Sequence, residues 1–309
     1  MTHVVIVGGG FAGLRTAKGL GGISGIEVTL FDARNHHLFQ PLLYQVAMAG
    51  LSPAEIAAPS RSILSEHANN RVLNERVDRI DLDGHRVVTS RGEQTYDTLV
   101  LACGARHSYF GHPEWEEHAP GLKTLAQATE IRRRVLHAFE EAEKADDPAQ
   151  RRALLTFVVI GGGPTGVELA GAIGEMSRFT LARDFRRIDP KLARVILIEA
   201  GPRILPMFEE SLASGAVRDL ESLGVQVWTQ SLVTGIDADG VEVGRERIES
   251  CSTLWAAGVE ASSLNANLGG ELDRQGRIHV RADLSLPGHP EVFVAGDQAH
   301  VEGPVSYTH

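Results

Sequence analysis

Cysteine and long apolar runs are both scarce in this 309-residue chain. Cys103 and Cys251 are its only cysteines and stand in separate segments, which excludes a disulfide framework and is typical of a reducing compartment. No apolar run approaches the roughly 18 residues that a membrane-spanning helix needs. The sequence starts with a strand pattern where a signal peptide would stand. These features together predict a cytoplasmic protein.

A surplus of positive charge is also lacking. The 30 Lys and Arg residues face 40 Asp and Glu residues, and the formal net charge of −10 argues against general affinity for nucleic acids. His36 and His37 are adjacent but have no acid or cysteine ligand set nearby, so we interpret them as polar loop residues and expect no metal site. The 33 glycines and a hydrophobic content of 43% suit an α/β protein with room for two domains.

Two glycine fingerprints carry most of the information in the chain. The first is Gly8-x-Gly10-x-x-Gly13, which follows the apolar run 4–7, and the next strand pattern ends at Asp32. This is the pattern of a dinucleotide-binding βαβ unit. The first glycine permits the tight turn, the second lets the backbone approach a pyrophosphate, and the third allows close packing of helix on strand. The acid would accept hydrogen bonds from ribose hydroxyls.

The same pattern occurs a second time. Gly161-x-Gly163-x-x-Gly166 follows the apolar run 157–160, and the next strand pattern ends at Glu199. An acid here favours NADH over NADPH, because it repels a 2′-phosphate. Two dinucleotide sites in one chain predict two bound dinucleotides, and the economical pair is a flavin with a nicotinamide.

Further patterns predict the elements around these units. We expect helices at 53–64 and 126–143, a strand at 75–82, a hairpin of 86–90 with 94–96, a buried strand at 98–102, and a polar linker at 145–150. Arg132, Arg133 and Arg134 are interpreted as a solvated helix face. A last strand, 291–297, has its best partner in the sheet of the first unit. The second fingerprint unit is therefore predicted to be an insertion in the first.

Four stretches make the chain resemble a known family. They are VIVGGGFAGL at residues 5–14, FQPLLYQVA at 39–47, GGGPTGVELAG at 161–171 and VFVAGD at 292–297. With them the chain resembles the two-dinucleotide-binding-domain flavoproteins, and among these the type II NADH dehydrogenases, which are non-proton-pumping NADH:quinone oxidoreductases. The likeness spans essentially the whole chain.

The resemblance implies an α/β fold of two Rossmann-like dinucleotide-binding domains, with the NAD domain inserted into the FAD domain. The FAD domain would comprise residues 1–120 and 270–309, and the NAD domain residues 121–269. It also implies FAD and NAD as cofactors, with hydride passing from NADH to the flavin and electrons then to a quinone. The flavin carries the chemistry, while the protein supplies positioning and electrostatics.

Site residues follow from the motifs and the resemblance. Glu168 is the candidate catalytic residue, because the family places a glutamate there near the stack of nicotinamide and flavin. The candidate cofactor-binding residues are Gly8, Gly10, Phe11, Ala12, Gly13, Asp32, Ala33, Gln40, Val77, Gly104, Gly161, Gly163, Thr165, Gly166, Glu199, Gly258, Gly296 and Asp297. Phe39, Leu42 and Tyr44 either pack near the flavin or belong to an ordinary core.

The chain departs from the family after the Gly-Asp motif. The family continues into a glutamine-containing quinone-site helix and amphipathic membrane-binding helices, whereas this sequence stops at His309. We expect attachment to the inner face of the plasma membrane only through such a region, and a homodimer is possible. With no Cys-x-x-Cys pair, a disulfide reductase is disfavoured. A reductase of a carrier such as ferredoxin or rubredoxin, and a non-catalytic nucleotide-binding remnant, stay open as alternatives.

Overall fold

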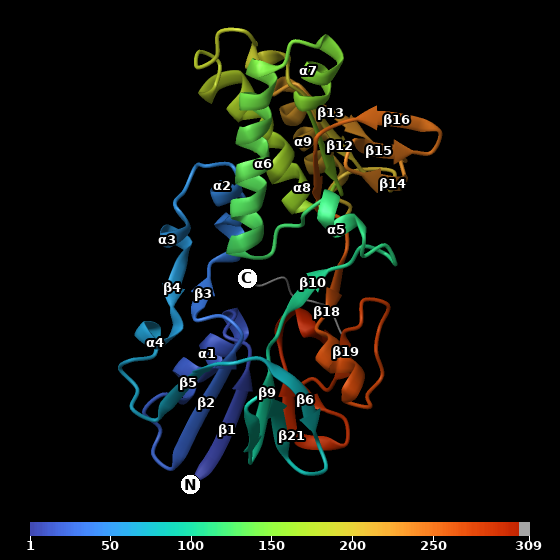
Figure 1. Ribbon diagram of the computed structural model, residues 1–309. Coiled ribbons are helices and arrows are strands. Elements are labelled where there is room, and N and C mark those ends of the chain that lie inside the picture. The colour runs from blue at the N-terminus through green and yellow to red at the C-terminus, as the bar shows by residue number, and fades with distance from the viewer. Residues whose placement is uncertain (303–309) are drawn as a thin grey trace. The chain divides into compact units, whose positions relative to one another are not determined.

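The computed structural model describes residues 1–302, which divide into two compact units (Figure 1). Unit 1 comprises Met1–Leu38, Ala57–Arg106 and the chain from Val259 onward, and unit 2 comprises Phe39–Ile56 and His107–Gly258. Both units are therefore discontinuous in sequence. This division differs from the predicted one, because the second unit is longer at its start, shorter at its end, and also contains residues 39–56.

Unit 1 is built on a six-stranded sheet with the order β20-β21-β9-β1-β2-β5. Only the edge strand β20 is antiparallel to its neighbour. The strands are β1 (Thr2–Val7), β2 (Ile26–Asp32), β5 (Asn70–Asn74), β9 (Thr98–Leu101), β20 (Ser285–Leu286) and β21 (His289–Val294). The pairing of β21 with β9 confirms that the last predicted strand belongs to the sheet of the first unit.

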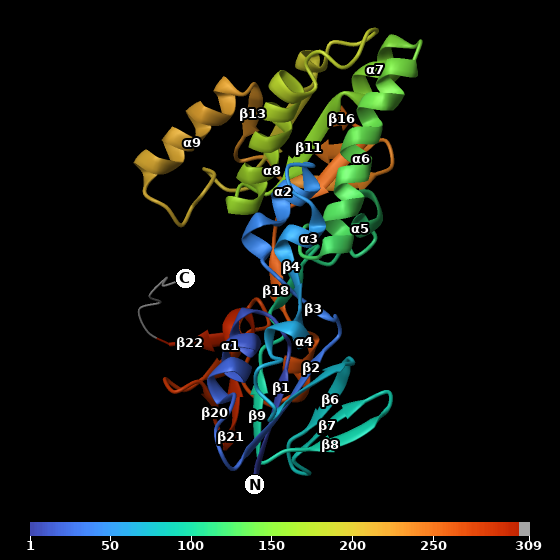
Figure 2. The same cartoon turned by 90° about the vertical axis from the view of Figure 1, so that its left-hand side faces the viewer.

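Smaller elements surround this sheet. They are α1 (Phe11–Leu20), β3 (His36–Leu38), β4 (Ala57–Pro59), α4 (Ser60–Ile63), β18 (Val259–Ala261), the 3-10 turns η4 (Ser263–Asn267) and η5 (Gly296–Gln298), β19 (Ile278–Val280) and β22 (Ala299–Val301). An antiparallel sheet, seen in Figure 2, consists of β6 (Val77–Asp81), β7 (Arg86–Thr89) and β8 (Gly92–Thr95). It contains the predicted strand and hairpin. The short strand β10 (Ala105–His107) crosses the boundary between the units.

The buried strand β1 contributes side chains to two hydrophobic clusters. Val4 and Ile6 belong to one cluster with Leu14 of α1, whereas Val5 and Val7 belong to another that includes the antiparallel sheet. Successive residues of a strand point to opposite faces of its sheet. A parallel strand covered on both faces is therefore an unbroken apolar run rather than an alternating one.

Unit 2 has a four-stranded parallel sheet of order β13-β12-β11-β17. Its strands are β11 (Thr156–Ile160), β12 (Arg194–Ile198), β13 (Val225–Trp228) and β17 (Ser252–Trp255), and β14 (Val233–Asp237), β15 (Gly240–Val243) and β16 (Glu246–Glu249) form an antiparallel sheet. The helices are α2 (Leu43–Ala47), α3 (Pro53–Ile56), α5 (Trp115–His118), α6 (Leu125–Lys144), α7 (Pro148–Leu154), α8 (Pro164–Glu175) and α9 (Glu210–Ser222). There are also the 3-10 turns η1 (Gln40–Leu42) and η3 (Pro190–Leu192) and the π-helical segment η2 (Met176–Thr180).

The two units share one topology. In each, the fingerprint strand lies between its second and fourth parallel strands, and a three-stranded antiparallel sheet is inserted before the fourth. Hydrophobic residues of that antiparallel sheet pack on one face of the parallel sheet in both units. The internal repeat is therefore larger than the βαβ unit that the glycine pattern indicates.

Two predicted elements are wrong in detail. Residues 53–64 do not form one helix, because β4 separates α3 from α4. Pro59 has no N–H to donate and restricts the residue before it, so the helix cannot continue. The predicted linker is also partly helical, since α7 begins at Pro148 and is capped by the Asp147 side chain. Asp before Pro is a helix-start signal.

Two other predictions concern polar side chains. His36 and His37 lie in β3, paired with β4, and not in a loop. The helix predicted at 126–143 is confirmed as α6, but its Arg134 is not simply solvated. The Arg134 guanidinium pairs with Glu130 and donates to the backbone carbonyl of His118, 3.2 Å away. Among residues 1–302, no helix has the length and apolar character that a membrane crossing requires.

We expect Asp147→Ala to destabilise unit 2 by about 1 kcal/mol, because the helix would lose its N-cap. The Asp147 carboxylate accepts hydrogen bonds from the N–H groups of Ala149 and Gln150, at 3.1 and 3.2 Å. Urea unfolding followed by circular dichroism measures the change. Asp147→Ser is the control, since serine also caps. Equal losses in the two variants would mean that the cap contributes nothing.

Candidate dinucleotide-binding sites

The first fingerprint makes a turn that only glycine fits at two of its positions. Gly8 has φ +105°, and a Cβ there would collide with the backbone of Ala102. A Cβ on Gly13 would collide with the carbonyl oxygen of Gly8. These two glycines therefore allow α1 to lie directly against the end of β1.

Gly10 is different, because packing does not require it. It is exposed, and a Cβ built on it would meet no atom within 4 Å. Gly10 is also the N-cap of α1, which has no side-chain cap. The positive end of the helix dipole is therefore directed at the open space beside Gly10, where it would stabilise an anion. The open space and the helix N-terminus fit the pyrophosphate of a dinucleotide.

Asp32 holds the other side of this turn. Its carboxylate accepts hydrogen bonds from the N–H of Gly9 and, at 2.6 Å, from the N–H of Arg34. The acid at the end of β2 is thereby fixed beside the fingerprint of β1. This is the position from which a carboxylate can accept hydrogen bonds from ribose hydroxyls.

The second fingerprint repeats this geometry. Gly161 has φ +110° and lies against the backbone of Ala256, and a Cβ on Gly166 would collide with the Gly161 carbonyl oxygen. Gly163 again has open space around it and is the uncapped N-terminus of α8.

The acid of the second unit is held as Asp32 is in the first. The Glu199 carboxylate accepts from the N–H groups of Gly162 and Gly201, each at 2.6 Å. The side chain of Arg203 donates to the carbonyl of Pro206 at 2.8 Å. The residues present therefore fit a pyrophosphate and a ribose in unit 2 as well.

Two further turns of unit 1 follow the carboxyl ends of parallel strands, as the first fingerprint follows β1. Gly104 follows β9 with φ +67°, and Gly296 follows β21 with φ +76°. A Cβ on Gly296 would lie 3.7 Å from the Cβ of Ala12, in the first turn of α1. Asp297 is exposed, and within residues 1–302 its carboxylate has no hydrogen bond or ion pair. The carboxyl ends of parallel strands are where ligands bind in open α/β sheets.

The remaining predicted residues are divided between the units. Phe11 begins α1, Ala33 is exposed beside Asp32, and the Val77 side chain is in the core of unit 1. Gln40 and Gly258 belong to unit 2. Thr165 lies in the first turn of α8, and Gly258 has φ +71° where a Cβ would collide with the ring of Phe110.

Glu168 lines a cavity of about 320 Å³ in unit 2. The walls come from α2, α8 and α9, and consist of Tyr44, Val167, Glu168, Gly171, Ala172, Glu175, Ala216, Asp219, Leu220 and Leu223. Glu168 is still exposed, but protein atoms around its carboxyl reduce hydration. This desolvation raises the pKa of Glu168. Tyr44 therefore belongs to the surroundings of Glu168, a placement that the sequence left open.

His37 is a residue that sequence reasoning missed. Its Nδ1 lies 3.1 Å from the carbonyl oxygen of Gly9, and its ring meets the Phe11 ring edge-on at 4.9 Å. It thus supports the first fingerprint from β3. The only available signal was its closeness in sequence to Asp32.

The two cysteines are unpaired, as expected, and belong to different units. Burial raises the pKa of the Cys103 thiol to about 12, so this group stays protonated and unreactive. Cys103 is therefore a small packing residue beside the first site rather than a redox centre.

Comparison with known proteins places these sites in a family context. The family model described as pyridine nucleotide-disulphide oxidoreductase matches residues 2–308. Two Mycobacterium tuberculosis proteins are similar over 97% of this chain: the type II NADH:quinone oxidoreductase Ndh is 47% identical with 68% of its length covered, and NdhA is 46% identical with 67% covered. The structure of Plasmodium falciparum NDH2 in complex with NADH has a TM-score of 0.88 at 20% identity, covering 97% of this chain and 65% of that one.

Substitutions at Gly10, which has open space around it, and at Gly13, which is packed against Gly8, should have different effects. Gly10→Val should fold but retain little flavin, because the side chain would fill the open space beside the helix N-terminus. Gly13→Val should fold poorly, because its side chain would collide with Gly8. Flavin absorbance per protein and the near-ultraviolet circular dichroism of each variant measure the two effects. A folded Gly10→Val protein with full flavin content would refute the prediction that the first fingerprint binds the flavin dinucleotide.

Proposed function

The chain belongs to the pyridine nucleotide-disulphide oxidoreductase family and, within it, to the type II NADH:quinone oxidoreductases, and on this basis we propose that it oxidises NADH and passes the electrons to a quinone. FAD and NAD(H) are its cofactors. The chain spans about two thirds of the length of the relatives reported above. The observation that carries the proposal is the fingerprint with its acid, built twice with the same geometry.

We propose that unit 1 holds FAD and unit 2 holds NADH. In unit 1, the N-terminus of α1 would bind the pyrophosphate, Asp32 the adenosine ribose, and Asp297 a hydroxyl of the ribityl chain. In unit 2, the N-terminus of α8 and the Glu199 carboxylate would do the same for the nicotinamide dinucleotide. When bound, FAD supplies the two-electron chemistry that links a hydride donor to the acceptor.

We propose that the protonated carboxyl of Glu168 supplies the proton that reduction of the quinone consumes. Quinone reduction by NADH consumes one proton in addition to the hydride, and a carboxyl with a raised pKa keeps its proton at higher pH than an ordinary one. The residues that line the cavity with Glu168 include alanines and leucines as well as Glu175 and Asp219, and the desolvation of Glu168 favours its neutral form.

The overall proposal is tested on the purified 309-residue protein. We expect a flavin spectrum that NADH bleaches without oxygen, and reoxidation by a water-soluble quinone. Reoxidation by ferredoxin or rubredoxin with no response to quinones would favour a carrier reductase. A colourless protein that cannot be reconstituted with FAD would refute the proposal.

We expect Glu199→Ala to narrow the preference for NADH over NADPH by about tenfold or more, because a charged hydrogen-bond acceptor and a charge repelling the 2′-phosphate are removed. The ratio of kcat/KM for the two cofactors at constant ionic strength measures this. Glu221→Ala, at an exposed acid of α9, is the matched control and should leave the ratio unchanged. Equal kcat/KM for NADH and NADPH in the unsubstituted protein would contradict the proposal that Glu199 binds the ribose of NADH.

We expect Glu168→Gln to lower kcat for quinone reduction by about tenfold, below the usual range for a general acid because water can partly replace an exposed carboxyl. The raised pKa should appear as a decline of kcat with rising pH, at a pH above the ordinary carboxyl value of 4.5. This step should vanish in Glu168→Gln and persist in Glu175→Gln, which alters another acid of the cavity. A pH step that survives in Glu168→Gln must belong to another group.

A further inference from the structure

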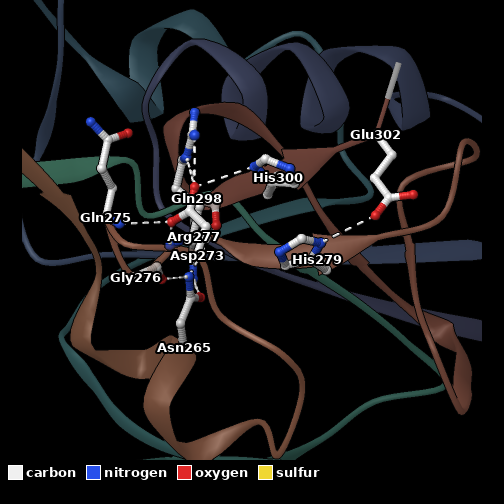
Figure 3. A network of polar contacts seen from close by, with 9 residues as sticks. All are labelled: Asn265, Asp273, Gln275, Gly276, Arg277, His279, Gln298, His300 and Glu302. Carbon is white, nitrogen blue, oxygen red and sulfur yellow. Dashed lines mark hydrogen bonds and ion pairs between the residues drawn. The ribbon is translucent and has the colours of Figure 1, made fainter.

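Two buried amide side chains of unit 1, those of Gln298 and Asn265, are hydrogen-bonded to each other and belong to a network of polar contacts (Figure 3). Gln298 comes from η5 and is 0% exposed, and Asn265 comes from η4 and is 1% exposed. Long amide side chains are seldom buried this completely, because each unpaired polar atom would cost free energy. The arrangement of their partners is therefore informative.

Gln298 joins two segments that are 195 residues apart in sequence. Its Oε1 accepts the N–H of Cys103 at 2.8 Å, and its Nε2 donates to Oδ1 of Asn265 at 2.7 Å. Both ends of this amide are thus engaged, and its orientation is determined, since a flipped amide would place a donor against the Cys103 N–H.

Asn265 continues the network. Its Nδ2 donates to the carbonyl of Gly276 at 2.8 Å and to the carbonyl of Gln298 at 3.0 Å. The same 3-10 turn begins after Ser262, whose N–H donates to the carbonyl of Gly104 at 3.2 Å. Ser262 and η4 together therefore bond to both turns, Ser262 to Gly104 after β9 and Asn265 to Gln298 after Asp297.

These bonds fix two backbone segments that carry candidate ligand-binding groups. Cys103 immediately precedes Gly104, and Gln298 immediately follows Asp297. The Gly8 turn lies against Ala102, and Gly296 lies near Ala12, so the same two segments also contact the first fingerprint. Gln298 and Asn265 are themselves buried.

We propose that Gln298 and Asn265 are positioning residues for FAD: they hold the Gly104 and Asp297 turns at the separation that the flavin-bearing half of the dinucleotide requires. The inference rests on the proposed function, in which unit 1 holds FAD. A buried hydrogen-bonded network acts this way when every member is satisfied, because each alternative arrangement leaves a polar atom unpaired. The network specifies the distance between the turns rather than simply filling the core.

The first experiment compares two isosteric changes in unit 1. Gln298→Met would leave the Cys103 N–H without its acceptor, and we expect the dissociation constant of FAD to rise about tenfold. Asn70→Leu is the control, since Asn70 also donates a long-range hydrogen bond, to the carbonyl of Ala17 at 3.1 Å, but lies at the start of β5. It should change the melting temperature of the flavin-free protein without changing FAD affinity.

The second experiment uses protonation as a rescue. In Gln298→Glu, a protonated carboxyl can accept from the Cys103 N–H and donate to Asn265, as the amide does, whereas the carboxylate cannot donate. We expect FAD affinity near that of the unsubstituted protein at about pH 5 and a loss of about tenfold at about pH 8. Gln298→Met should show no such dependence.

Other titratable groups near the network are present in every variant. His300 of β22 pairs with Asp273 at 3.2 Å, and His279 of β19 lies 3.8 Å from Glu302. Before β19, Arg277 pairs with Asp273 at 2.6 Å. These groups and the Cys103 thiol are common to the unsubstituted protein and to Gln298→Glu, so the pH profile of the unsubstituted protein is subtracted from that of the variant. Figure 3 shows these pairs.

The possible outcomes separate this inference from the proposed function. Failure of the unsubstituted protein to bind FAD would refute the proposed function. If it binds FAD and Gln298→Met binds equally well, the positioning role is wrong. The positioning role is also wrong if Gln298→Met and Asn70→Leu lose FAD affinity in proportion to their loss of thermal stability. It is wrong, too, if the FAD affinity of Gln298→Glu depends on pH as that of the unsubstituted protein does. Binding is measured by the quenching of FAD fluorescence, so none of these readouts depends on turnover.

Discussion

Each unit depends on the contact between a helix and the strand that precedes it, which is so close that no side chain fits between them. At Gly13 and at Gly166, the missing Cβ is replaced by the carbonyl oxygen of the first glycine of the fingerprint. This contact places the N-terminus of α1 or α8 directly at the end of its strand. The N-terminus of the helix then faces open space beside Gly10 or Gly163, where the helix dipole would stabilise an anion.

The acids depend on the same contact. Asp32 and Glu199 each accept from the N–H of the residue between the first two glycines, and from the N–H two residues after the acid. Because the turn position is fixed by the glycines, the carboxylate position is fixed as well. The repetition of this arrangement in two units with a common strand order indicates that both were built for the same class of ligand.

Around that shared frame, each unit acquires its own additional groups. Unit 1 adds the Gly104 and Asp297 turns and the amide network behind them, whereas unit 2 adds the cavity that Glu168 shares with Tyr44. Desolvation at Glu168 and the full pairing of Gln298 have the same physical basis, which is the high free energy of a polar group that loses water without gaining a partner. At Glu168 this free energy favours the protonated carboxyl. At Gln298 it favours the amide orientation that bonds to Cys103 and Asn265.

The sequence alone determined the fold class, the two fingerprints, their acids and the return of the last strand to the first sheet, because these follow from glycine positions and from local apolar runs. It did not reveal the break at Pro59 or the start of α7 after Asp147, although both had local signals. Only the tertiary structure decided that residues 39–56 pack with unit 2, that His37 supports the first fingerprint, and that Gln298 bonds to Cys103. The reason is that these contacts join residues far apart in the chain, where no periodicity or spacing relates one partner to the other.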